Sequence, residues 1–159
     1  MDTTAFFNYP TLAAAAPAAD AAARVADGDL LPGATVADWD ALLAATETLR
    51  FRPGDTVLRA GERDRALYLL LDGRLEGEGG GAGCAAPAAL GVAAFLDGLP
   101  RAVTMLARTH GEVARLSWEA YEALAARDAR VGRMVLADAG RLMAARVRAA
   151  GPALPGWTG

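Results

Sequence analysis

The residues best suited to chemistry in this sequence lie in the apolar segment 90–104. Arg101 offers a planar fork of N–H donors that suits the oxygens of a phosphate group. Gly91 stands ten residues earlier and, because it has no side chain, can let a ligand approach the backbone closely. Pro100 fixes the entry into the strand expected after Arg101. The segment therefore predicts a phosphate pocket made of a small apolar turn and one arginine.

Few other residues combine into a reactive site. His110 is the only histidine and lies in a Thr-His-Gly turn, so a histidine-based metal centre or nucleophilic triad lacks its partners. Cys84 is the only cysteine, which excludes an internal disulfide and a cysteine-built metal site within one chain. The glycine cluster 77–83 lacks the lysine of a P-loop. We therefore expect no catalytic residue, no metal and no cofactor, and we predict that the protein is not an enzyme.

Length and charge narrow the class of protein. The 159 residues suit one domain with a small appendage, and the net charge of −3 gives no overall positive field that would attract a nucleic acid. The uncharged runs 3–19 and 79–96 are interrupted by prolines and are not apolar enough to span a bilayer, and the first residues lack a positively charged signal region. The sequence therefore predicts a cytoplasmic protein with no membrane span.

The elements that would position Arg101 begin with a helix. The tetrapeptide Thr35-Val36-Ala37-Asp38 is typical of a capping box and predicts that a helix starts there. We expect this helix to end before Phe51 and residues 51–55 to form a turn. One side of the helix should carry its apolar residues: Val36, Trp39, Leu42 and Leu43.

Short apolar runs then predict β-strands over 56–60, 66–71, 74–78, 102–107 and 113–116. Asp72-Gly73 is a dipeptide favoured in tight hairpin turns, so we expect a hairpin between the second and third of these strands. The glycine-rich stretch after residue 77 is interpreted as a loop, and residues 90–96 as one short helical turn.

The C-terminal part is predicted to be helical. Ser117 should cap a helix over 118–126, and Asp128 a long helix that reaches residue 150, where Gly151 and Pro152 end it. The long helix carries two apolar stripes. The first contains Val131, Val135 and Leu142, and the second contains Leu136, Gly140, Met143, Val147 and Ala150. Either the second stripe pairs with a second copy of the chain, giving a homodimer, or both stripes pack on one core.

Together these segments resemble the cyclic nucleotide-binding domain family, the regulatory module of catabolite-activator-type transcription factors, cyclic-nucleotide-dependent kinases and gated channels. The segments that carry the resemblance are, in order, Phe51-Arg52-Pro53-Gly54-Asp55; Gly61-Glu62 with Ala66-Leu67-Tyr68-Leu69-Leu70-Leu71-Asp72-Gly73-Arg74-Leu75; Leu90-Gly91 to Leu96 with Pro100-Arg101; and Glu112-Val113-Ala114-Arg115-Leu116-Ser117. The resemblance implies an α+β fold: an antiparallel, jelly-roll-like β-roll flanked by an N-terminal helix and two C-terminal helices.

Three regions are predicted along the chain. Residues 31–150 form the cyclic nucleotide-binding-like domain, 1–30 a low-complexity leader, and 151–159 a C-terminal tail. The aromatic cluster 6–10 is either part of a frayed leader or a peg that docks on this domain or on a partner. Because the chain ends soon after the long helix, we expect no DNA-binding helix-turn-helix.

The resemblance also implies a ligand site. In the family an arginine binds the cyclic phosphate, backbone amides assist it, and a glutamate binds the ribose hydroxyl. Carried over, Arg101 is the phosphate partner, and the backbone contacts come from Gly91, Ala93, Ala102 and Val103. Val92 stands where the family has the glutamate. Loss of a charge-assisted hydrogen bond costs roughly 1.5 to 3 kcal/mol, so binding of cyclic AMP or cyclic GMP should be weaker than in the family.

Two functions remain open at this stage. The first is a non-enzymatic regulatory sensor with weak or altered nucleotide binding, whose long helix reports occupancy to a dimer partner or another protein. The second is a ligand-independent dimerisation or interaction module that kept the roll and lost the pocket. Arg101 decides between them, because it either faces a ligand or serves the structure by pairing with an acid or with carbonyl groups.

Overall fold

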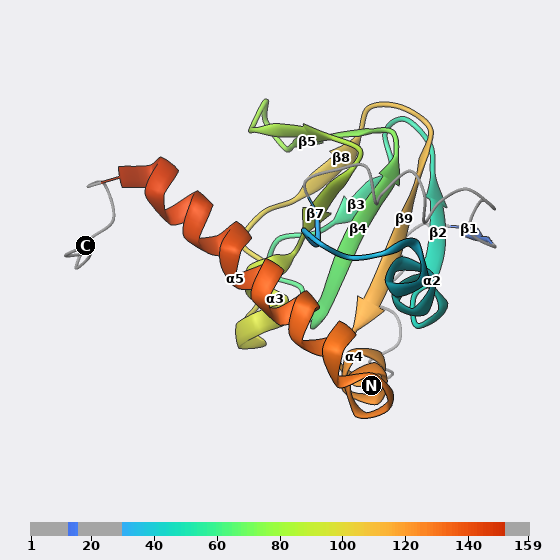
Figure 1. Ribbon diagram of the computed structural model, residues 1–159. Helices are drawn as coiled ribbons and strands as arrows, with labels where there is room; N and C mark the ends of the chain where they lie inside the picture. The colour runs from blue at the N-terminus through green and yellow to red at the C-terminus, as the bar shows by residue number, and fades with distance from the viewer. Residues whose placement is uncertain (1–12, 16–29, 152–159) are drawn as a thin grey trace, which may run out of the picture.

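The computed structural model describes residues 13–15 and 30–151 (Figure 1). Its elements are β1 (Ala13–Ala15), α2 (Val36–Ala44), β2 (Glu47–Phe51), β3 (Thr56–Leu58), β4 (Ala66–Asp72), β5 (Arg74–Gly77), β6 (Gly83–Ala85), β7 (Ala88–Leu90), α3 (Val92–Asp97), β8 (Met105–Ala107), β9 (Gly111–Ser117), α4 (Trp118–Arg127) and α5 (Ala129–Ala150). The predicted order of a helix, a β-roll and two helices is confirmed. Among the described helices, none is both long and apolar enough to cross a membrane.

Two antiparallel sheets form the β-roll. The first has the strand order β1-β2-β9-β4-β7 and the second β3-β8-β5-β6. The central pair is β4 with β9, which runs in register from Ala66 opposite Ser117 to Leu70 opposite Val113. The implied α+β roll with flanking helices is therefore correct.

Strand β4 separates two hydrophobic clusters because its successive side chains point to opposite faces. Leu67, Leu69 and Leu71 face the first cluster, which they share with residues of α2, α3, α4 and α5. Alternate residues, such as Tyr68 and Leu70, face the second cluster between the two sheets. The strand is buried on both faces, which explains its continuous apolar run.

The predicted helix caps are confirmed. The Thr35 hydroxyl accepts from the Asp38 amide at 3.2 Å, and the Asp38 carboxylate accepts from the Thr35 amide at 2.8 Å, which closes the capping box. Ser117 accepts from the Ala120 amide at 3.1 Å, and Asp128 caps α5. One expectation for α2 is wrong: Val36 is 50% exposed and does not join the buried side of the helix.

Four short strands, β2, β6, β7 and β8, were missed or only partly predicted from the sequence. Residues 47–51 form β2, which pairs with β9, whereas the sequence suggested a helix followed by a turn. The sequence predicted no strand for the residues of β6 and β7, and β8 is shorter than the strand expected over 102–107. Each of these strands is three to five residues long, and β2, β7 and β8 pair with strands distant in sequence, whereas β6 pairs with the preceding strand β5.

The hairpin expected at Asp72-Gly73 is also wrong. Strands β4 and β5 belong to different sheets and do not pair with each other. Gly73 has a φ of +95°, and a Cβ there would lie 2.7 Å from the His110 carbonyl oxygen and 2.9 Å from Phe51 Cζ. The glycine therefore turns the chain from one sheet into the other at a crowded point.

Part of the predicted leader belongs to the fold. Ala13–Ala15 form β1, which pairs antiparallel with β2, so these three residues do not form a frayed end. The aromatic cluster 6–10, the rest of the leader and residues 152–159 lie outside the described residues.

Helix α5 crosses the body of the roll, and its last turns project beyond it (Figure 1). Val131 and Val135 are buried in the first cluster and Leu142 packs against it, as expected for the first stripe. The second stripe is divided: Leu136 is 38% exposed, whereas Met143 also packs against the first cluster. One core therefore covers the first stripe and only part of the second.

Candidate ligand-binding site

The segment after β7 folds as α3 and then as a loop that carries Arg101. Gly91 precedes α3 with a φ of +69°, and Gly98 ends the helix with a φ of +70°. The loop is fixed to the turn before β4, because the Arg101 amide donates to the Glu62 carbonyl at 2.9 Å and the Gly61 amide donates to the Arg101 carbonyl at 2.7 Å. Leu99 and Val103 point outward, yet Arg101 is only 5% exposed.

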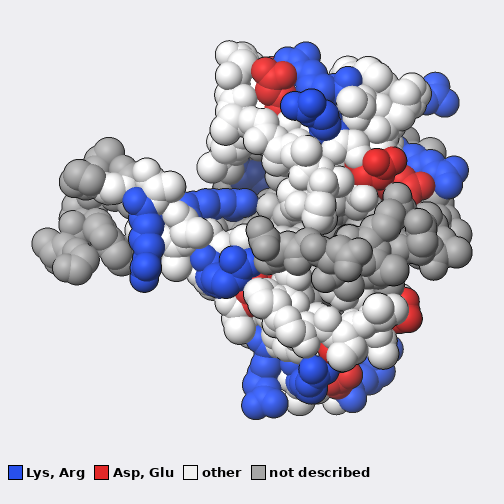
Figure 2. Space-filling view, turned by 45° about the horizontal axis from the view of Figure 1, so that its top comes forward, with Lys and Arg blue, Asp and Glu red and all other residues white. Residues whose placement is uncertain are grey.

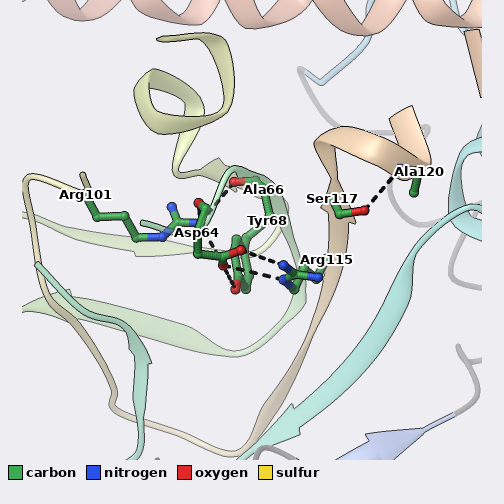
Figure 3. A network of polar contacts seen from close by, with 7 residues as sticks. All are labelled: Asp64, Ala66, Tyr68, Arg101, Arg115, Ser117 and Ala120. Carbon is green, nitrogen blue, oxygen red and sulfur yellow. Dashed lines mark hydrogen bonds and ion pairs between the residues drawn. The ribbon is translucent and has the colours of Figure 1, made fainter. Parts of the chain in front are cut away.

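One nitrogen of the Arg101 guanidinium makes all of its hydrogen bonds to described residues. Nη2 donates to the Asp64 carbonyl at 2.8 Å, to Asp64 Oδ2 at 3.1 Å and to the Ala66 carbonyl at 3.1 Å (Figure 3). Nε and Nη1 are buried and have no hydrogen-bond partner. A buried donor without a partner costs about 1 to 3 kcal/mol. Arg101 is thus partly a structural residue and partly an unsatisfied cation.

Gly91 makes room for this guanidinium. A Cβ at position 91 would lie 2.2 Å from Arg101 Nη1 and 3.1 Å from the Ala66 carbonyl oxygen. The sequence predicted that Gly91 lets another group come close to the backbone. In this structure that group is the side chain of Arg101.

Asp64 is the acid that holds Arg101. Its carboxylate also accepts from Arg115 Nη2 at 2.5 Å and from the Tyr68 hydroxyl at 2.6 Å (Figure 3). Burial acts to raise the pKa of Asp64, but the hydrogen bonds from Arg115 and Tyr68 outweigh it, so the pKa lies below its usual value. Asp64 is therefore ionised at neutral pH.

The cluster around Asp64 carries an excess of positive charge. Two guanidinium groups, those of Arg101 and Arg115, face the single carboxylate of Asp64. Burial and the hydrogen bond to Asp64 raise the pKa of Tyr68, so this hydroxyl stays neutral. The nearby carboxylate of Glu62 interacts with Asp64, Arg101 and Arg115, and the positive charge of Arg59 also acts on Glu62. Counted over these five side chains, the cluster carries one net positive charge.

A cavity of about 710 Å³ adjoins Arg101. Its wall contains all six residues that the sequence assigned to the site: Gly91, Val92, Ala93, Arg101, Ala102 and Val103. It also contains residues that the sequence did not assign, among them Glu78 in the loop after β5 and Met143 and Arg146 on α5. A volume of this size is typical of small-molecule sites.

The position expected to hold a sugar hydroxyl has no polar side chain. Val92 is fully buried and belongs to the first hydrophobic cluster. Val103 is 54% exposed at the edge of the cavity. Among the described residues of the cavity wall, Glu78 is the one carboxylate, and its place in a glycine-rich loop gave no signal in the sequence.

The comparisons with known proteins agree with this geometry. Residues 48–128 match the family model described as the cyclic nucleotide-binding domain. A search of curated proteins finds no match. A cyclic nucleotide-binding domain from Methylobacillus flagellatus kt is a similar solved structure, with a TM-score of 0.78 and 23% identity over 94% of this chain and 92% of that one.

Two further solved structures share the fold. The catabolite activator protein of Thermus thermophilus has a TM-score of 0.66 and 24% identity, over 77% of this chain and 60% of that one. The N-terminal domain of a transcriptional regulator from Streptomyces coelicolor A3(2) has a TM-score of 0.64 and 19% identity, over 84% of this chain and 96% of that one. At these identities the likeness concerns the fold.

Proposed function

The chain belongs to the cyclic nucleotide-binding domain family, and we propose from this premise that it is a non-enzymatic regulatory sensor that binds a small anion in the cavity beside Arg101. One observation carries the proposal: a buried guanidinium in a cavity wall has two nitrogens without partners. A phosphate of a cyclic nucleotide would give those nitrogens acceptors and would balance the excess charge.

The remaining site residues have smaller parts in this proposal. Gly91, Ala93, Ala102 and Val103 contribute backbone contacts, and Val92 contributes none to a sugar hydroxyl. An unheld hydroxyl loses roughly 1.5 to 3 kcal/mol, or about one to two orders of magnitude in affinity. We therefore expect cyclic AMP and cyclic GMP to bind about ten to a hundred times more weakly than they would with a carboxylate at position 92.

Binding must also move Arg101. Its Nε and Nη1 atoms are closed off from solvent, since the side chain lies under Gly91 and is held by Asp64. A ligand reaches them when Arg101 or α3 shifts toward the cavity. Because α3 packs against α5, such a shift would reach the long helix, whose projecting end is free to report it.

Isothermal titration with cyclic AMP and cyclic GMP, together with thermal unfolding, tests the proposal. The wild type should bind at least one nucleotide and gain stability from it. Arg101→Ala should weaken binding by about tenfold or more, and Arg101→Lys should recover only part of it, because lysine keeps the charge but lacks the planar fork. Arg133→Ala is the matched control, because Arg133 is exposed on α5 and lies outside the cavity wall.

The proposal fails if the wild type shows neither heat nor a rise in melting temperature with millimolar cyclic nucleotide. It also fails if Arg101→Ala and Arg133→Ala bind the nucleotide with the same affinity.

A ligand-independent dimerisation module is the second candidate. It is favoured by the exposure of Leu136 and Gly140 on the free side of α5. Sedimentation should then show a dimer that Leu136→Glu disrupts and that Ala137→Glu, an equal charge change at the neighbouring exposed position, leaves intact. A wild type that sediments as a monomer eliminates this candidate.

A further inference from the structure

The cavity has a second cationic residue, on a different element. Arg146 of α5 lies in the same wall as Arg101, on which the family resemblance rests. Arg146 Nη2 donates to the Ala89 carbonyl of β7 at 3.1 Å, which holds its guanidinium against the sheet. That bond uses one of the five N–H groups that an arginine carries.

A thiol lies near Arg146 in the same wall. Cys84 belongs to the same cavity wall. Burial raises the pKa of Cys84, and the positive charge of Arg146 acts in the opposite direction. Arg146 therefore lies close enough to Cys84 for its charge to act within the cavity wall, which agrees with its hydrogen bond to Ala89.

The charges of the wall favour an anionic ligand with more than one charge. The described residues of the wall include two cationic side chains, Arg101 and Arg146, and one carboxylate, Glu78. Most of the other wall residues are glycine, alanine or larger apolar residues. Figure 2 shows further arginine side chains along the projecting part of α5, with the acidic side chains gathered mainly on the body of the molecule. A ligand that enters the cavity beside α5 therefore meets two positive regions, one at the arginines of α5 and one at Arg101.

We propose that the ligand carries two acidic groups on one molecule, one bound at Arg101 and the other at Arg146, with an apolar or aromatic body between them. A cyclic dinucleotide, which has two phosphodiester groups and two bases, has this chemistry. The inference rests on the proposed function, because Arg101 must be a ligand residue for Arg146 to be the second one.

The two contacts should differ in strength. Arg101 is buried and makes the stronger contact, whereas Arg146 is exposed to solvent. An exposed ion pair is screened by salt and contributes little, so we expect the second contact to improve affinity about fivefold at low ionic strength and to fade at high ionic strength.

Isothermal titration with cyclic AMP and cyclic di-AMP tests the inference, because these probes share a base and differ in the number of phosphodiester groups. In the wild type, cyclic di-AMP should bind about fivefold more tightly than cyclic AMP at low salt. Arg146→Ala should bring the ratio of the two dissociation constants close to one. Arg148→Ala should preserve the ratio, since Arg148 is exposed on the same helix but is outside the cavity wall.

Each other result is decisive. A ratio that Arg146→Ala and Arg148→Ala lower equally shows only the general charge of α5 and overturns the inference. Binding of cyclic AMP that depends on Arg101, without a preference for cyclic di-AMP, overturns the inference and leaves the proposed function intact. Binding of neither probe overturns both.

Discussion

Two arginine side chains lie against opposite ends of α3: that of Arg65 against the C-terminal end and that of Arg101 beside Gly91 at the N-terminal end. Arg65 Nε donates to the Phe95 carbonyl at 3.0 Å and Nη2 to the Leu96 carbonyl at 2.9 Å, while its guanidinium stacks 3.6 Å from the centre of the Trp118 ring. Arg101 has bonds at one nitrogen only. The guanidinium of Arg65 is thus bonded at two nitrogens to the carbonyls of α3, whereas two nitrogens of Arg101 lack acceptors among the described residues.

The two arginines of this small region therefore differ in how completely the protein supplies them with hydrogen-bond acceptors. Arg65 links α3 to the start of α4, where Trp118 packs edge-on against Phe95 with ring centres 5.1 Å apart. Arg101 adjoins the cavity, and its partner Asp64 is the residue directly before Arg65 in the chain. The turn before β4 therefore holds the arginine side chains at both ends of α3.

Asp64→Asn should have the largest effect on this comparison. The variant leaves Arg101 and Arg115 without their carboxylate and should lose about 2 to 4 kcal/mol of stability at neutral pH, as when one partner of a largely buried ion pair is removed. At the same time, anion binding at Arg101 should become tighter, because no internal carboxylate competes with the ligand.

Urea unfolding at several pH values measures the first effect. The folded pKa of Asp64 is lowered, so its contribution to stability is present above the unfolded value, about 4, and is lost as the pH falls through the lower folded value. The difference between wild type and Asp64→Asn should therefore shrink in acid. Asp40→Asn, at an exposed position of α2, is the control. A difference that stays constant with pH would contradict the role of the Asp64 charge.

Gly91→Ala and Gly98→Ala compare the two ends of α3 directly. Both glycines have nearly the same positive φ, so both substitutions carry a backbone cost of roughly 1 to 2 kcal/mol. At position 91 the new Cβ also meets Arg101 Nη1 at 2.2 Å, whereas at position 98 the nearest atom is Arg65 Cδ at 3.5 Å. Gly91→Ala should lose about 1 to 3 kcal/mol more than Gly98→Ala in urea unfolding, through overpacking. Equal losses would show that Arg101 can move away from Gly91 at no cost.

The sequence predicted best the features that depend on neighbouring residues. The caps at Thr35, Ser117 and Asp128 are correct because each side chain bonds an amide within three residues of itself. The hairpin predicted at Asp72-Gly73 is wrong because the chain there depends on distant residues. Its geometry depends on Phe51 and His110, which are distant in sequence, and a dipeptide pattern contains no information about them.

The candidate site follows the same rule. The six predicted residues lie together in the cavity wall because the motif that carries them is one continuous segment that folds as a unit. Asp64 was not assigned to the site, since its partners Arg101 and Arg115 are 37 and 51 residues away. Arg146 was not assigned to the site either, because only the fold shows that α5 passes beside the cavity.

Arg65→Ala and Arg101→Ala should show the smallest difference in stability of the three comparisons, and this difference separates the two arginines most clearly. Arg65→Ala removes two charge-assisted hydrogen bonds and a cation–π contact and should cost about 2 kcal/mol in urea unfolding, with little change in anion affinity. Arg101→Ala removes a cation with two unsatisfied nitrogens and leaves Asp64 bound to Arg115 and Tyr68, so its cost should be below about 1 kcal/mol. Its effect should fall on the affinity instead. If Arg101→Ala were the more destabilising of the two, Arg101 would be a structural residue like Arg65, and the sensor function would lose the observation that supports it.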